Sequence, residues 1–138
     1  MQPAWIPPNL RFEMDDATLP WTWAENTFDF IHLRHLFGAI PDWTALFTQA
    51  YRCCRPGGWI ESSELDAAIR SDDGTAEPHP VLARWTQMFR EAGQKTGRPF
   101  TVVADGLQYT CMEAVGFTDI TVVNKKVGLL SGGWCDQG

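Results

Sequence analysis

Residues 28–65, FDFIHLRHLFGAIPDWTALFTQAYRCCRPGGWIESSEL, determine the predicted fold. They begin with FDFIHL (28–33), a short apolar run that is typical of a buried strand. Apolar residues then recur at helical spacing after Pro41, a residue that suits the first turn of a helix. RPGG (55–58) is a signal for a helix stop and a turn, and WIESSEL (59–65) is a second buried strand. The order strand, helix, strand predicts a unit of a parallel sheet.

Further elements are predicted on either side of this unit. NLRFEM (9–14) alternates apolar and polar residues, which indicates a short strand. The loop SDDGTAEPHP (71–80) leads to two amphipathic helices, predicted over 81–92 and 105–115. The central unit is therefore expected to be extended at both ends by regular structure.

The carboxyl-terminal segment predicts a change in strand direction. FTDITVV (117–123) is a predicted strand, and 127–134 is its predicted antiparallel hairpin partner after a turn. We therefore expect one α/β domain over residues 1–138, with a mostly parallel sheet that ends in an antiparallel hairpin.

Composition excludes several classes of protein. The chain has 138 residues, of which 44% are hydrophobic and 20% charged, as in a soluble globular domain. A net charge of −6 without a basic stripe argues against a nucleic-acid partner. No apolar run approaches the roughly 20 residues of a membrane span, and the first ten residues do not form a secretory signal. These features predict a cytoplasmic location.

Aromatic and sulfur-containing side chains each allow more than one interpretation. Seven tryptophans and eight phenylalanines either fill a core or line a pocket for a flat apolar ligand. The four cysteines show no metal-ligand spacing, and neither do His32 and His35. We therefore expect reduced thiols and no metal site.

Five segments in this order resemble class I S-adenosylmethionine-dependent methyltransferases, most closely the fungal LaeA-like enzymes of secondary metabolism. The segments keep the family's order and spacing over about four fifths of the chain, and their combination is more specific than any one alone. They are NLRFEMDDA (9–17), FDFIHLRHLFGAIPDW (28–43), RPGGWIESSE (55–64), SDDGT (71–75) and GFTDITVV (116–123). The resemblance also allows a nuclear location.

The resemblance implies a role for two residues at the methyl donor. Asp16 would accept a hydrogen bond from the adenine amino group, and the backbone N–H of Ala17 would meet a ring nitrogen. A solvated turn is the structural alternative for this acidic segment.

The resemblance also implies a reaction centre at the carboxyl ends of the two central strands, where ligands bind in open α/β sheets. His32, Arg34 and His35 would lie near the sulfonium or the substrate. Glu61 and Glu64 would orient or deprotonate the substrate. The alternatives are a hydrogen-bonded core position for His32, and a structural ion pair between Arg34 and one of the glutamates.

A substrate pocket is expected to be aromatic, for a small apolar natural-product intermediate. Its candidate lining residues are Trp21, Trp23, Trp43, Trp59 and Trp85.

The glycine-rich turn that opens the family's donor site does not occur within these residues, nor does the ribose-binding acid that follows it. The resemblance therefore implies a truncated Rossmann-like fold without strands 1 and 2, in a short relative or a truncated product. The apolar strand 28–33 would then be a sheet edge, which proteins normally cover. We expect a homodimer through this edge.

Three functions follow as hypotheses. The first is a protein of fungal natural-product biosynthesis that no longer methylates, needs no cofactor, and acts as a cyclase, isomerase or lyase by acid/base and positioning catalysis. The second is a methyltransferase whose S-adenosylmethionine site is completed by a partner or a swapped protomer. The third is a non-catalytic pseudoenzyme or regulatory binding module.

Overall fold

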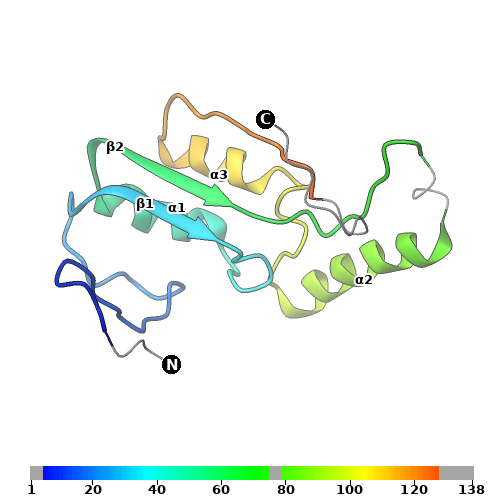
Figure 1. Cartoon of the computed structure of the whole chain (residues 1–138), viewed down its shortest axis with the longest axis horizontal. Coiled ribbons are helices and arrows are strands. Elements are labelled where there is room, and N and C mark those ends of the chain that lie inside the picture. Colours follow the sequence, from blue (N-terminus) through cyan, green and yellow to red (C-terminus); the bar gives the residue numbers. More distant parts are fainter. Residues whose placement is uncertain (1–4, 75–78, 128–138) are drawn as a thin grey trace.

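The computed structural model describes residues 5–74 and 79–127 (Figure 1). The predicted central strands and all three predicted helices are present, with boundaries shifted by a few residues. The elements are β1 (Phe28–Arg34), α1 (Trp43–Cys53), β2 (Cys54–Ser63), α2 (Pro80–Thr96) and α3 (Leu107–Val115). The predicted α/β class is therefore confirmed.

β1 and β2 form a parallel two-stranded sheet, as the strand–helix–strand order predicts. In the register of the pair, Phe30 lies opposite Trp59 and His32 opposite Glu61. Both strands end at the same side of the molecule, where their arrowheads point in Figure 1. Residues at the carboxyl ends of the two strands are thus brought together.

The helix stops where RPGG (55–58) predicts, because α1 ends at Cys53. The RPGG segment lies within the bounds of β2 but interrupts its pairing: Phe28 pairs with Cys54 and Phe30 with Trp59, and Gly57 between them is left-handed with φ 79°. A Cβ atom on Gly58 would lie 2.9 Å from the carbonyl oxygen of Asp29. Glycine is needed at this position because the backbone of β1 approaches it closely.

The hydrophobic core lies on one face of the sheet. Ile31 and Leu33 of β1 pack there against buried residues of α1 and against Met112 of α3. Side chains alternate between the two faces of a strand, so the neighbouring positions point the other way. Phe30 and Trp59 are accordingly 56% and 68% exposed on the open face.

The strands predicted at 9–14 and 117–123 are not formed. The backbone hydrogen bonds near the first segment are local turns, such as Leu10 N–H to Pro7 O at 3.0 Å. Apolar side chains of both segments remain exposed, including Met14 and Val123. A strand needs a neighbouring backbone to pair with, and in the described structure β1 and β2 pair only with each other. Apart from Val127, the predicted hairpin partner 127–134 lies outside the described residues.

α2 lies beyond the carboxyl ends of the strands, at the lower right of Figure 1, and none of its residues is buried. Ring contacts connect it to the loop after β1, with Phe89 5.7 Å from Phe100 and Phe100 6.1 Å from Phe37. The indole N–H of Trp85 also donates to the carbonyl oxygen of Ala67 at 3.1 Å. Among the described helices, none has the length and apolar character needed to cross a membrane.

Candidate functional site

His32 and Glu61 form a polar pair across the two strands. Nδ1 of His32 lies 2.9 Å from Oε2 of Glu61, and the two side chains are 43% and 60% exposed. They share the open sheet face with Phe30, whose ring stacks on the imidazole at 6.3 Å. His32 is hydrogen-bonded, but it lies on an accessible surface and not in the core.

The geometry of this pair favours one arrangement of hydrogen atoms. Glu61 can accept a hydrogen bond from Nδ1 when that nitrogen carries the hydrogen of the neutral imidazole. Nε2 of His32 then has a free lone pair that faces away from Glu61. A histidine oriented in this way can take a proton from a bound molecule.

Glu64 has a different environment from Glu61. Its carboxylate accepts hydrogen bonds from the backbone N–H groups of Leu36, at 2.9 and 3.1 Å, and of Phe37, at 3.0 Å. The backbone N–H of His35 donates to the Ser63 carbonyl at 3.0 Å, and His35 adopts a left-handed conformation with φ 54°. Glu64 therefore holds the turn after β1 in place.

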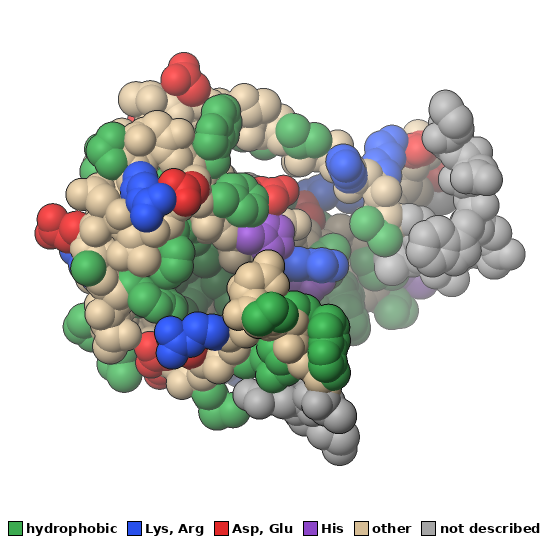
Figure 2. Space-filling model, turned by 60° about the vertical axis from the view of Figure 1, so that its left-hand side comes forward, with side chains coloured by type: hydrophobic (Ala, Val, Ile, Leu, Met, Phe, Trp, Pro, Cys, Tyr) green, Lys and Arg blue, Asp and Glu red, His purple; other side chains and the backbone are tan. Residues whose placement is uncertain are grey.

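Arg34 ends β1 with an exposed side chain. Within residues 5–74 and 79–127 its guanidinium has no ion-pair partner, so the alternative of a structural ion pair with a glutamate is not observed. Figure 2 shows histidine, acidic and basic side chains gathered near the centre of one face of the molecule.

Ala17 lines a surface hollow of about 180 Å³, and Asp16 precedes it in the chain without being part of the lining. The carboxylate of Asp16 accepts hydrogen bonds from the Thr18 hydroxyl at 2.7 Å and the Thr18 N–H at 2.9 Å, and these bonds lower the pKa of Asp16. The hollow is lined by residues 17–20 on one side and by residues 40–42 and the first turns of α1 on the other.

The hollow is largely apolar. Its walls include the apolar side chains of Leu19, Pro20 and Ile40. The adjacent Asp16 is an ionised acceptor, and the Ala17 backbone N–H has no hydrogen-bond partner among the described residues.

The five candidate pocket tryptophans do not line one cavity. Trp21 and Trp23 contact each other edge to face at 5.5 Å, ahead of β1. Trp43 is a core residue, 3% exposed, whose indole N–H finds no partner among the described residues. Trp59 lies on the open sheet face, and Trp85 lies on α2. The alternative of rings that fill a core thus describes Trp43, and in part Trp21 and Trp23, which are half-buried and pack against the core.

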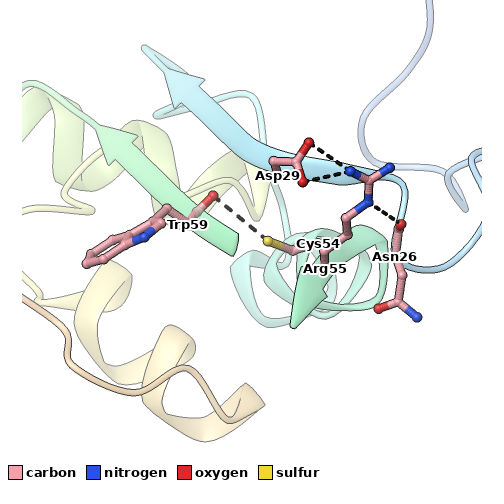
Figure 3. Close-up of polar contacts among 5 residues, drawn as sticks. All are labelled: Asn26, Asp29, Cys54, Arg55 and Trp59. Atoms are coloured by element: carbon pink, nitrogen blue, oxygen red, sulfur yellow. Dashed lines mark hydrogen bonds and ion pairs between the residues drawn. The ribbon is translucent and has the colours of Figure 1, made fainter. Parts of the chain in front are cut away.

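Sequence reasoning missed the residues that join the beginnings of the two strands. Nη1 of Arg55 lies 2.7 and 2.9 Å from the carboxylate oxygens of Asp29, and its Nε donates to the Asn26 carbonyl at 3.0 Å (Figure 3). Beside them burial raises the pKa of the Cys54 thiol, whose Sγ lies 3.9 Å from the Trp59 carbonyl oxygen. No spacing rule connects Asp29 to Arg55, because their contact depends on the parallel register.

Metal-ligating side chains do not gather in the described part of the chain, where no group of three or more His, Cys, Asp or Glu residues could hold an ion.

Comparison with known proteins identifies relatives over nearly the whole chain. A family model described as a methyltransferase domain matches residues 3–122. Secondary metabolism regulator LAE1 of Cochliobolus heterostrophus is 38% identical over 122 residues, which cover 87% of this chain and 39% of that protein. Methyltransferase pytC of Aspergillus terreus is 37% identical over 134 residues, covering 97% and 40%. Probable methyltransferase tdiE of Emericella nidulans is 37% identical over 112 residues, covering 80% and 34%.

The chain spans about two fifths of the length of the first two of these relatives. No solved structure shows significant similarity to it.

Proposed function

This chain belongs to the methyltransferase domain family, and from that premise we propose that it takes part in S-adenosylmethionine-dependent methylation of a small hydroxylated metabolite in fungal secondary metabolism. The chain contributes the groups that activate the methyl acceptor and those that hold the adenine end of the donor. The His32–Glu61 pair on the open sheet face carries the proposal. Relatives named as fungal methyltransferases and secondary metabolism regulators support the biological setting.

His32 is the general base of the proposed reaction. Nε2 removes the proton from the acceptor hydroxyl as that oxygen becomes the nucleophile, and the resulting imidazolium later releases the proton to water. Glu61 accepts the Nδ1 hydrogen, which orients the ring and stabilises the positive charge. Arg34 lies at the end of β1 and has no ion-pair partner among the described residues, so its guanidinium can attract the developing negative charge on the acceptor.

His35 and Glu64 are proposed to position the base and not to react. The bonds from Leu36 and Phe37 occupy the Glu64 carboxylate. They stabilise the turn in which His35 follows β1, and thereby fix the end of the strand that carries His32.

Asp16 and Ala17 are proposed to hold the donor. S-adenosylmethionine, when bound, supplies an electrophilic methyl group on a sulfonium. The Asp16 carboxylate would accept from the adenine amino group, the Ala17 N–H would donate to a ring nitrogen, and Leu19 and Ile40 would cover the ring faces. The remaining donor contacts would come from polypeptide other than these 138 residues, or from a second copy.

A second candidate function is proton-transfer catalysis without methylation, namely cyclisation, isomerisation or elimination of a natural-product intermediate. One observation favours it: the His32–Glu61 pair is complete within this chain, whereas the hollow beside Ala17 accounts for the adenine end alone. Both functions use the same base, so donor binding distinguishes them.

Calorimetric titration of S-adenosylmethionine and, separately, of adenosine into the 138-residue chain tests the proposal. We expect both ligands to bind, and Asp16→Asn to weaken both by about tenfold through loss of one charge-assisted hydrogen bond. Asp15→Asn is the matched control, because it removes a neighbouring charge outside the proposed contact, and it should leave binding unchanged.

If neither S-adenosylmethionine nor adenosine released heat, the proposed donor site would be wrong, and proton-transfer catalysis would be the better account.

Nitrogen chemical shifts of the His32 ring test the base independently of any activity. We expect the neutral ring to carry its hydrogen on Nδ1, and Glu61→Leu, which removes the acceptor, to abolish that preference. A ring protonated on Nε2 in the unmodified chain would contradict the proposed role of His32.

A further inference from the structure

Gln49 of α1 hydrogen-bonds to the segment that precedes β1. Its Oε1 accepts from the Trp21 backbone N–H at 3.3 Å and from Arg52, whose Nη2 lies at 3.0 Å and Nε at 3.4 Å. Arg52 also donates from Nη1 to the Trp23 carbonyl at 2.9 Å and from Nη2 to the Trp21 carbonyl at 3.0 Å. Gln49 and Arg52 are both half-buried, so water competes less for these bonds than on an open surface. The side chain of Gln49 is therefore fixed at its oxygen end.

The direction of the Gln49 amide follows from these contacts. A guanidinium and a backbone N–H are donors only, so the amide oxygen must face them. The amide nitrogen, Nε2, is the end that remains, and it has no hydrogen-bond partner among residues 5–74 and 79–127. Gln49 therefore has two N–H donors available to another molecule.

Gln49 lines the same hollow as Ala17. Hydrogen bonds join the two walls of this hollow, because Trp21 contacts both: its backbone N–H donates to Gln49, and its indole N–H donates to the Ala17 carbonyl at 3.3 Å. The other lining residues are mostly apolar, Leu19 and Ile40 among them. Apolar walls do not orient a bound molecule, so a fixed polar group among them determines how it binds.

We propose that Gln49 is a binding residue of this hollow, whose Nε2 donates a hydrogen bond to a ring nitrogen of the bound base. The inference rests on the proposed function, in which the hollow takes the adenine end of the methyl donor. Adenine has acceptor nitrogens on more than one edge, so Gln49 and the Ala17 N–H each donate to a different one. Arg52 is a positioning residue, because it holds the amide oxygen and leaves the nitrogen for the ligand.

Gln49→Glu separates binding from the structural contacts of the same side chain. A carboxylate oxygen still accepts from Arg52 and from the Trp21 N–H, so the midpoint of urea denaturation should be unchanged or higher. The variant has no donor at this position, so calorimetric titration should show about tenfold weaker binding of adenosine. Adenosine is the probe because it is uncharged, which limits the direct effect of the added charge.

Thr48→Glu is the matched control for charge. It adds a carboxylate one residue earlier on α1, at an exposed position that does not line the hollow. It should bind adenosine as tightly as the unmodified chain does. Analogues of adenosine in which carbon replaces N1, N3 or N7 identify the accepting nitrogen. The unmodified chain should bind the analogue without that nitrogen about tenfold more weakly than adenosine, and Gln49→Glu should bind the two equally.

Three results would overturn the role of Gln49 and leave the donor site in place. They are equal adenosine affinities of Gln49→Glu and the unmodified chain, equal losses from Gln49→Glu and Thr48→Glu, and a weaker affinity of Gln49→Glu that comes with a lower urea midpoint. The last of these would assign Gln49 a structural role alone. Absence of adenosine binding to the unmodified chain is a different result, because it would overturn the donor site of the proposed function together with this inference.

Discussion

Gly38 and Phe100 occupy adjoining space that a larger residue at position 38 could not share. A Cβ atom on Gly38 would lie 2.1 Å from Cε1 of the Phe100 ring, and Gly38 also has a left-handed backbone with φ 72°. Phe100 contacts Phe37 on one side and Phe89 of α2 on the other. The glycine therefore makes room for the ring that connects α2 to the end of β1.

Gly38→Ala should lower the free energy of unfolding by about 1–3 kcal/mol, because both the clash and the backbone conformation oppose it. Urea denaturation measures the change. Gly97→Ala is the matched control, since its φ of 66° is similar but no atom lies within 4 Å of the added Cβ. Equal losses from the two variants would show that the contact with Phe100 contributes nothing.

Glu64→Gln should destabilise the chain by about 1–3 kcal/mol, because a charged acceptor of backbone N–H groups from Leu36 and Phe37 is weakened. Glu61→Gln should change stability by less than about 1 kcal/mol, since an exposed ion pair contributes little. Urea denaturation of both variants measures the two losses in unfolding free energy and so compares the positioning role of Glu64 with the exposed ion pair of Glu61. A larger loss for Glu61→Gln than for Glu64→Gln would contradict the assignment of Glu64 to positioning.

The sequence predicted the structure best where residues close together in the chain form a regular pattern of apolar positions. The run 28–33 and the helical spacing after Pro41 predicted β1 and α1, because an apolar run indicates a buried strand and apolar residues at helical spacing indicate a helix with one buried face. It was misleading for 9–14, where alternation indicates a strand only if another backbone is available to pair with it. RPGG (55–58) correctly indicated the helix stop, but the segment forms an irregularity within β2, where Gly58 also allows a close approach of β1.

The candidate site was predictable in its residue types but not in its contacts. Placement of His32 and Glu61 at the same end of two parallel strands follows from the predicted topology. The different environment of Glu64 does not, because it depends on how the turn at 35–38 folds back onto the strand end. The exposure of Trp59 likewise depends on which face α1 covers, which periodicity alone does not specify for adjacent buried strands.

The lowered pKa of Asp16 has a defined consequence for stability. Hydrogen bonds from Thr18 favour the ionised carboxylate in the folded chain, so the folded pKa lies below the unfolded one. The resulting stabilisation is fully present above the unfolded pKa and is lost as the pH falls through the folded pKa. Thr18→Val should raise the pKa of Asp16, as measured by carbon NMR titration of its carboxyl group. An unchanged titration curve would show that the Thr18 hydroxyl does not stabilise the ionised carboxylate of Asp16.

Replacement of Trp43 and Trp59 by alanine distinguishes a core tryptophan from an accessible one. Trp43 is 3% exposed and packs 5.8 Å from Phe47, so Trp43→Ala should cost about 3–5 kcal/mol of unfolding free energy. Trp59→Ala should change the unfolding free energy of the monomer by about 0.5 kcal/mol or less, because its ring covers no buried residue of its own chain. Urea denaturation at a concentration where the chain is monomeric measures both. A large loss for Trp59→Ala under these conditions would mean that the open sheet face is covered within a single chain, and the His32–Glu61 pair on that face would then be inaccessible to a substrate.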